Sequence, residues 1–184
     1  MEFQSHCDIP DHILLQNVSS PKEYFELLFS EETMVIFVKE INAYADDFFD
    51  LHPALRKTGD FKYWKEVTAN DIKAYLGLII YMGFNKLPQI RDYWKNSSLY
   101  RPTFCSDVMS RTKFFLLNKF FHIADNKNSN TSNKLYKLRT LLWRLISNWQ
   151  KHYQLCREVT IDERMVPFRG RIKFKHFMKE KPIK

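Results

Sequence analysis

The chain has 184 residues, of which 45% are hydrophobic and 16% aromatic, so it is long and apolar enough to bury a sizeable core. With this aromatic content and only 4 Gly and 7 Pro, a disordered or low-complexity chain is excluded. The formal net charge of +8 is uneven: residues 1–133 sum to −2 and residues 134–184 to +10, a distribution typical of a polyanion site, although a solvated basic face gives the same pattern.

Residues 1–20 are polar and irregular, and we expect a flexible N-terminal segment there. Pro21 predicts the start of a helix, because a residue without an amide hydrogen is tolerated in the first turn. Ser30 is the expected N-cap of the next helix, which should end near residues 51–53. Its apolar side chains recur every three or four residues: Met34, Phe37, Val38, Ile41, Tyr44 and Ala45.

The stretch WKEVTANDIKAYLGLIIYMGF (residues 64–84) gives the clearest helix prediction. Thr68 and Asp71 have the spacing of a capping box. The broad apolar face that follows is typical of a buried helix: Ile72, Tyr75, Leu76, Ile79 and Ile80. Pro88 opens a short amphipathic segment, and Ser106 is expected to begin a further helix, with apolar side chains at Met109, Phe114, Leu117 and Phe121.

A polar stretch at residues 125–133 predicts a loop. An amphipathic helix is expected after it, with one apolar face: Leu135, Leu138, Leu142, Leu145, Trp149 and Tyr153. The apolar stripes of all these helices indicate packing faces rather than cofactor sites, because periodicity of this kind ordinarily marks a core.

From Cys156 onward the period changes from that of a helix to that of a strand. In residues 157–164 Val159 and Ile161 share one side, and residues 171–181 alternate less regularly. An isolated hairpin is marginally stable in water, so this pattern indicates the start of a larger sheet. The predicted fold class is mainly α: a flexible segment (1–20), a helical module (21–155) and the first β-hairpin of an incomplete domain (156–184).

The three cysteines, Cys7, Cys105 and Cys156, form no CxxC pair, so a structural zinc site is not expected. Scattered thiols fit a reducing compartment. Residues 1–10 lack the apolar core of a signal peptide, and apolar windows such as Leu76–Met82 are too short to cross a bilayer. We therefore expect a soluble intracellular chain with no membrane partner.

Asp162 comes directly after the first predicted strand, and two interpretations of it stay open. It could be a strand-end acid in solvent, or one paired with a neighbouring arginine. It could instead be a metal ligand, because carboxylates suit Mg²⁺ or Mn²⁺ and phosphoryl transfer on DNA often uses two such ions about 4 Å apart. One aspartate cannot hold both ions.

Residues 164–184 carry eight Lys and Arg against one acid, Glu180. Contacts between such cations and phosphates are independent of sequence and weaken with salt. Lys173 and Lys175 flank Phe174, so on a strand the two lysines share a face. A solubilising face is the alternative. The candidate DNA-binding residues are Arg164, Arg169, Arg171, Lys173, Lys175, Lys179 and Lys181.

Several ordered blocks resemble a known family. TIDERMVPFRGR (160–171), followed by FKHFMKEKPIK (174–184), closely resembles the segment around the first catalytic aspartate of piggyBac-type transposases. PKEYFELLF (21–29), EINAYADDFF (40–49), residues 64–94 and MSRTKFFLLNKFFHIADN (109–126) are similar to earlier blocks of that family, although Ile41 stands where Thr is usual. The resemblance covers about residues 21–184.

The resemblance implies a helical region that dimerises and contacts transposon-end DNA, followed by an RNase H-like sheet. Three aspartates of that sheet bind two Mg²⁺ or Mn²⁺ ions, and Asp162 matches the first. The other two have no counterpart among these 184 residues, so we expect at most a weak, incomplete metal site at Asp162. The chain alone is then expected neither to cut nor to join DNA.

The expected function is that of a truncated piggyBac-like DNA transposase, located in the nucleus and inactive alone. In one interpretation it is an inert remnant. In another it is a helical DNA-binding or dimerisation module, forming a homodimer or pairing with a full-length relative that it regulates. A third interpretation is a helical protein-interaction domain unrelated to DNA, against which the charge of residues 134–184 argues.

Overall fold

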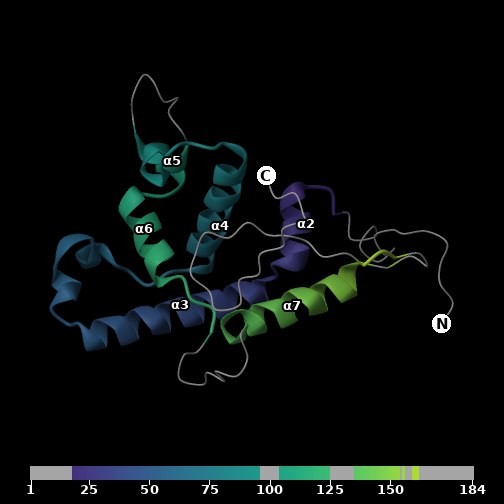
Figure 1. Cartoon of the computed structure of the whole chain (residues 1–184), viewed down its shortest axis with the longest axis horizontal. Coiled ribbons are helices and arrows are strands. Elements are labelled where there is room, and N and C mark those ends of the chain that lie inside the picture. Colours follow the sequence, from purple (N-terminus) through teal and green to yellow (C-terminus); the bar gives the residue numbers. More distant parts are fainter. Residues whose placement is uncertain (1–17, 96–103, 125–134, 154, 156–158, 162–184) are drawn as a thin grey trace, which may run out of the picture.

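The computed structural model describes residues 18–95, 104–124, 135–153, 155 and 159–161. The long helix α3 forms the base of the body, α4, α5 and α6 lie over one side of it, and α2 and α7 lie near its N-terminal end (Figure 1). The mainly α fold class is confirmed. The elements are α2 (Pro21–Leu28), α3 (Glu31–Leu51), η1 (Leu55–Lys57), η2 (Gly59–Tyr63), α4 (Ala69–Phe84), η3 (Ile90–Trp94), α5 (Cys105–Val108), α6 (Arg111–Phe120) and α7 (Tyr136–His152).

Helix α3 supplies the centre of the core. It packs against α4 and α6 and ends at Leu51, as its sequence predicted. The burial of a large apolar side chain contributes about 1.5–3 kcal/mol, so this stripe is the main source of stability in the described residues. Its buried apolar side chains are Met34, Phe37, Ile41, Ala45 and Phe49.

Phe120, the last residue of α6, packs the segment that follows α3, which includes η2, against the core. Its ring is fully buried. The ring centroid lies 4.7 Å from that of Trp64 and 5.3 Å from that of Phe48. The rings of Phe49 and Phe61 lie at 5.5 and 6.1 Å. These tilted and edge-on contacts suit the charge distribution of aromatic rings and hold α3, η2 and α6 together.

The predicted helix beginning at Ser106 is wrong, because this region forms two helices. α5 begins at Cys105 and ends at Val108, and Met109 is extended, with φ −155° and ψ 139°. The Met109 carbonyl accepts a hydrogen bond from the Trp94 indole at 2.8 Å, which draws the backbone away from a helical path. Ser110 then caps α6, its hydroxyl accepting from the Lys113 amide at 3.3 Å.

Helix α4 is less buried than its composition predicted. Ile72 and Tyr75 are buried as expected, together with Leu78. Ile79 and Ile80, which the sequence also assigned to the buried face, are 43% and 48% exposed. In the described part of the chain α4 packs mainly on α3, so a face broader than that contact remains exposed. The prediction that the whole apolar face of α4 is buried is therefore wrong.

Helix α7 lies against α2, yet none of its side chains is buried among the described residues. Its predicted packing face therefore points largely outward, with Leu138 45% and Trp149 62% exposed. No helix in the described ranges is both long and apolar enough to cross a bilayer.

Of the predicted β-hairpin, only residues 159–161 of the first strand are described, and they are exposed and belong to no strand. The rest of the hairpin lies outside the described residues. The hairpin, the RNase H-like domain and the domain boundaries stay predictions.

Candidate nucleic-acid interface

Every residue that the sequence assigned to metal or DNA binding lies outside the described residues: Asp162, Arg164, Arg169, Arg171, Lys173, Lys175, Lys179 and Lys181. The structure does describe the helix that leads toward them. α7 carries Lys and Arg side chains but no acid, so it forms part of the same basic half of the sequence.

Two cations of α7, Arg144 and Lys151, face the acidic junction between α2 and α3, whereas Lys137 and Arg139 are exposed elsewhere on the helix. Arg144 Nη1 lies 2.7 Å from Glu32 Oε2, and the Asn148 side-chain amide donates to the Leu28 carbonyl at 2.7 Å. A hollow beside them is lined by Glu26, Leu27, Ser30, Glu31, Glu32, Asn148, Lys151 and His152. A phosphate at Arg144 would have to displace a carboxylate, so this side of α7 is a poor polyanion site.

Lys73 of α4 reaches the same acidic junction. Its ammonium lies 3.1 Å from Glu26 Oε1 and also donates to Glu31. The hydrogen bonds to Glu31 and then Glu26 raise the pKa of Lys73. Exposed pairs of this kind contribute at most about 1 kcal/mol each. The acids of the α2–α3 junction are thus shared between α4 and α7, which leaves little uncompensated negative charge there.

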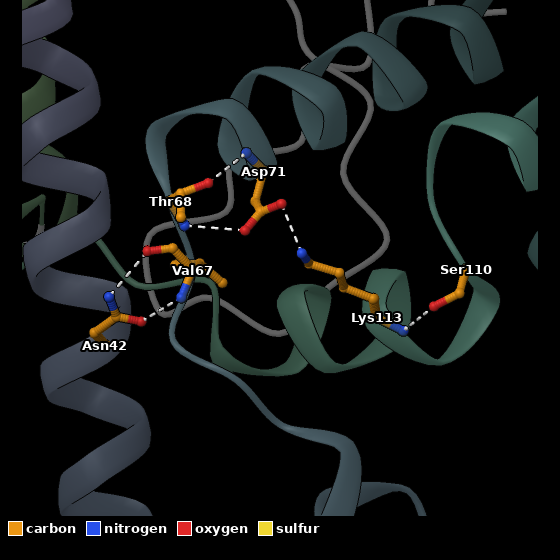
Figure 2. A network of polar contacts seen from close by, with 6 residues as sticks. All are labelled: Asn42, Val67, Thr68, Asp71, Ser110 and Lys113. Atoms are coloured by element: carbon orange, nitrogen blue, oxygen red, sulfur yellow. Dashed lines mark hydrogen bonds and ion pairs between the residues drawn. The ribbon is translucent and has the colours of Figure 1, made fainter.

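A polar joint connects α3, the start of α4 and α6, and consists of Asn42, Val67, Thr68, Asp71, Ser110 and Lys113 (Figure 2). The Asn42 side-chain amide forms two hydrogen bonds with the backbone of Val67, one as acceptor and one as donor. Its Oδ1 accepts from the Val67 amide at 2.9 Å, and its Nδ2 donates to the Val67 carbonyl at 3.1 Å. This pair satisfies a backbone unit that the buried Val67 side chain draws toward the core.

Asp71 completes the joint. It accepts from the Thr68 amide at 3.0 Å while the Thr68 hydroxyl accepts from the Asp71 amide at 3.3 Å, which confirms the predicted capping box. Lys113 Nζ of α6 lies 2.6 Å from Asp71 Oδ1. Partial burial raises the pKa of Asp71, but the bonds from Lys113 and Thr68 outweigh it, so the pKa is lowered. The joint fixes where α4 starts; it is architectural rather than catalytic.

A second group of cations, which sequence reasoning missed, lies on aromatic rings around η2. Lys119 Nζ is 4.6 Å from the centroid of the Phe61 ring, and Arg56 Cζ is 5.3 Å from that of Phe49. The signal in the sequence is the alternation of cations and aromatics in HPALRKTGDFKYWK (52–65). A hollow of about 330 Å³ beside them is lined by Thr58, Gly59, Asp60, Phe61, Phe115, Leu116 and Lys119.

This aromatic–basic combination suits nucleic acid, since bases stack on rings and cations attract phosphates. Its charge is lower than that of residues 164–184, however, because Asp60 lines the same hollow and Asp50 is exposed at the end of α3. The predicted basic segment therefore remains the stronger candidate for binding DNA.

A metal centre gains no support from the described ranges, in which no three His, Cys, Asp or Glu side chains come together to hold an ion. Asp162 alone would suit only a weakly held, largely hydrated Mg²⁺. The metal thus remains a prediction tied to Asp162.

Comparison with known proteins shows that the chain is similar to transposases and to proteins derived from them. A family of transposases, described as Transposase IS4, matches residues 20–184. The human PiggyBac transposable element-derived protein 2 is 29% identical over 170 residues, covering 90% of this chain and 26% of that protein. The human PiggyBac transposable element-derived protein 3 is 30% identical over 165 residues, covering 90% and 26%.

The human PiggyBac transposable element-derived protein 5 is 26% identical over 150 residues, covering 79% of this chain and 27% of that protein. The chain therefore spans about a quarter of the length of these curated relatives. No solved structure matches it.

Proposed function

This chain belongs to the Transposase IS4 family, with piggyBac-type relatives, and on that premise we propose that it is a transposase-derived protein that binds DNA through its basic C-terminal residues. The observation that carries the proposal is the coincidence of two features. The family match runs over residues 20–184, and the same stretch contains the whole positive excess, +10 in residues 134–184. A polyanion is the partner that such a distribution favours.

Binding is proposed to be independent of DNA sequence and sensitive to salt, and to take place in the nucleus. The proposed contacts are Arg164, Arg169, Arg171, Lys173, Lys175, Lys179 and Lys181. In the described residues, by contrast, Arg144 and Lys73 are already compensated by acids of the α2–α3 junction. This difference supports the assignment of DNA binding to the C-terminal cations.

The test is the salt dependence of binding to a short duplex, measured by fluorescence anisotropy between about 50 and about 200 mM salt. Each phosphate contact contributes about 0.9 to the slope of log K against log salt, so K173Q/K175Q should lower the slope by about 1.8. The matched control is K57Q/K86Q, which removes two exposed cations from the described helical region and should leave the slope unchanged. Equal losses in both variants would contradict the assignment.

We further propose that the 184-residue polypeptide, tested as such, does not cut DNA. Asp162 supplies one carboxylate toward Mg²⁺ or Mn²⁺, and the removal of ligands that act as a unit abolishes nearly all the catalysis. A supercoiled plasmid incubated with the polypeptide and either ion should stay intact. Metal-dependent nicking that D162A abolishes would overturn this part of the proposal and leave the DNA-binding part standing.

A second candidate function is pairing, either with another copy or with a full-length relative whose activity it would regulate. The observation that favours it is the apolar face of α7, which remains exposed in the described residues. Self-association without DNA binding would favour this function over the first.

A further inference from the structure

Helix α7 presents apolar side chains on the side opposite to its contacts with Glu32 and Leu28. Steps of four, four, three and four residues place them on one face of the helix, over about 22 Å. Four of the five are between 45% and 62% exposed among the described residues, and the fifth, Leu142, is partly buried. A continuous exposed apolar surface marks an interaction site. We call it the outer face of α7: Leu138, Leu142, Ile146, Trp149 and Tyr153.

The charge of α7 restricts what can cover this face. The helix contains four Lys and Arg side chains and no Asp or Glu. Arg144 and Lys151 face the acids of the α2–α3 junction, whereas Lys137 and Arg139 are exposed near the N-terminal end of the helix. Helical spacing places Arg139 beside Ile146, at the edge of the outer face. An occupant that complements this surface is therefore apolar and carries negative charge.

One segment of this chain outside the described residues has both properties. Residues 1–17 hold three acids and no Lys or Arg, which gives a net charge of −3, and their apolar side chains include Ile9 and the run ILL at 13–15. The other long segments differ. Residues 162–184 hold eight Lys and Arg against three acids, so α7 would repel them. Residues 125–133 contain no apolar side chain, and residues 96–103 carry Arg101 and no acid.

Residues 1–17 also join the described body close to α7. Helix α2 packs against α7, and the hollow between them is lined by Glu26 of α2 and by Lys151, near the C-terminal end of α7. Val18, the first described residue, precedes Glu26 by only eight positions. An extended chain advances about 3.3 Å per residue, so residues 8–17 can span about 33 Å, more than the length of the outer face.

We propose that residues 8–17 dock within the same chain along the outer face of α7, in the direction antiparallel to the helix. In that direction the apolar run at 13–15 covers Trp149 and Ile146. Asp8 and Asp11 then reach the basic end of the helix, near Arg139. The expectation of a flexible N-terminal segment is thereby narrowed to residues 1–7. The inference depends neither on DNA binding nor on cleavage.

The docked state should be only weakly favoured, because few side chains make the contact. A short tether holds the segment at an effective concentration on the order of 1 mM. If the same segment as a free peptide bound with a Kd of about 0.5 mM, the docking equilibrium constant would be about 2. Amide exchange that requires an uncovered α7 would then be slowed by about threefold.

Disulfide trapping in the full chain tests where the segment lies. Cys7 immediately precedes the docking residues, and L138C places a thiol at the end of the outer face that they should reach. C156S removes a competing thiol, and Cys105 is fully buried. Under mild oxidation of about 1 µM protein, far below the effective concentration of the tethered segment, a disulfide within one chain should form. The matched control F84C, at an 87% exposed residue of α4, should react about tenfold more slowly.

Amide hydrogen exchange gives a second readout, which needs no introduced thiol. I13S/L14S weakens the apolar contact and should speed the exchange of α7 by about threefold. The matched control Q16S/N17S changes two polar residues of the same segment and should leave the exchange unchanged. D8N/D11N should cause a smaller acceleration, which disappears at about 1 M salt because the charges are screened. Circular dichroism checks that the variants keep their helix content.

Equal disulfide rates with L138C and F84C, or unchanged α7 exchange in I13S/L14S, would overturn the proposal. A disulfide that joins two chains at about 1 µM, rather than closing within one, would mean that the occupant comes from a second copy and that docking within the chain is wrong. If Q16S/N17S accelerates exchange as much as I13S/L14S, the segment acts through the start of α2 and not through the outer face, which contradicts the proposal as well.

Discussion

Helices α4 and α7 both have apolar side chains at helical spacing, but they are held in the structure in different ways. Both have a long apolar face, but α4 buries Ile72, Tyr75 and Leu78, whereas α7 buries no side chain in the described residues. The start of α4 is fixed by polar contacts as well as by its buried side chains, whereas α7 is attached by polar contacts and by the partly buried Leu141. Periodicity therefore predicts where the apolar side of a helix lies, but not which surface covers it.

The energetic consequence is a large difference in how much each helix contributes to stability. Buried apolar side chains contribute kilocalories each, whereas exposed ion pairs contribute fractions of one. The core of α3, α4 and α6 should therefore dominate unfolding, and α7 should contribute little. The predictions below test this difference, beginning with the largest expected effect.

Truncation of Phe120 should give the largest loss in the free energy of unfolding. F120A removes a fully buried ring and leaves a cavity among its neighbours, at a cost of about 3–5 kcal/mol in the free energy of unfolding. W149A removes an aromatic side chain that is 62% exposed and should cost less than about 0.5 kcal/mol. Urea titration followed by circular dichroism, at concentrations below self-association, measures both. Similar losses in the two variants would refute the contrast between core and α7.

A matched pair of amides tests the polar contacts of the two regions. N42A leaves both the amide and the carbonyl of Val67 without their partner in a partly buried place, and should cost about 2 kcal/mol. N148A removes one bond to the Leu28 carbonyl and should cost about 1 kcal/mol or less. The same urea titrations compare them. If N148A is the more costly variant, α7 is more firmly attached than its contacts indicate.

The smallest expected effect depends on pH. Because the pKa of Asp71 is lowered in the folded chain, its ionised form stabilises the fold above the ordinary value of 3.8. That contribution is lost as the pH falls below 3.8 and through the lower pKa of the folded state. D71N should therefore cost about 1 kcal/mol near pH 7, with the difference from the unmodified chain shrinking toward pH 3.

Thermal unfolding at several pH values provides the measurement for D71N. The control is D60N, at an exposed acid of η2 that makes no part of the polar joint. A constant difference between D71N and the unmodified chain over this pH range would mean that the charge of Asp71 contributes nothing.

Local signals in the sequence predicted helix starts well. Pro21 begins α2 after the N-cap Ser20, and Thr68 with Asp71 forms the expected capping box. Both depend on residues within three positions of each other, so short-range chemistry is enough to determine them. The α3 stripe was equally readable, because its partners α4 and α6 cover its apolar side.

The misses have long-range causes. The break at Met109 depends on a hydrogen bond from Trp94, fifteen residues earlier, which no local pattern contains. Ile79 and Ile80 are exposed because the other described elements cover only part of the α4 surface. For the site, sequence predicted Asp162 and the basic C-terminal residues, which lie outside the described residues and stay predictions, while it missed the cations lying on rings around η2.

The polar attachment of α7 also determines how a partner of that helix can be detected. A ligand stabilises only the equilibrium to which its binding is linked, and a molecule on the exposed apolar side chains of α7 is linked first to the docking of that helix. A weakly bound partner would then barely shift the melting of the α3 aromatic core, because α7 undocks before that core melts. A thermal-shift screen that reports on Trp64 or its neighbours would overlook such a molecule, whereas amide hydrogen exchange resolved along α7 would reveal it.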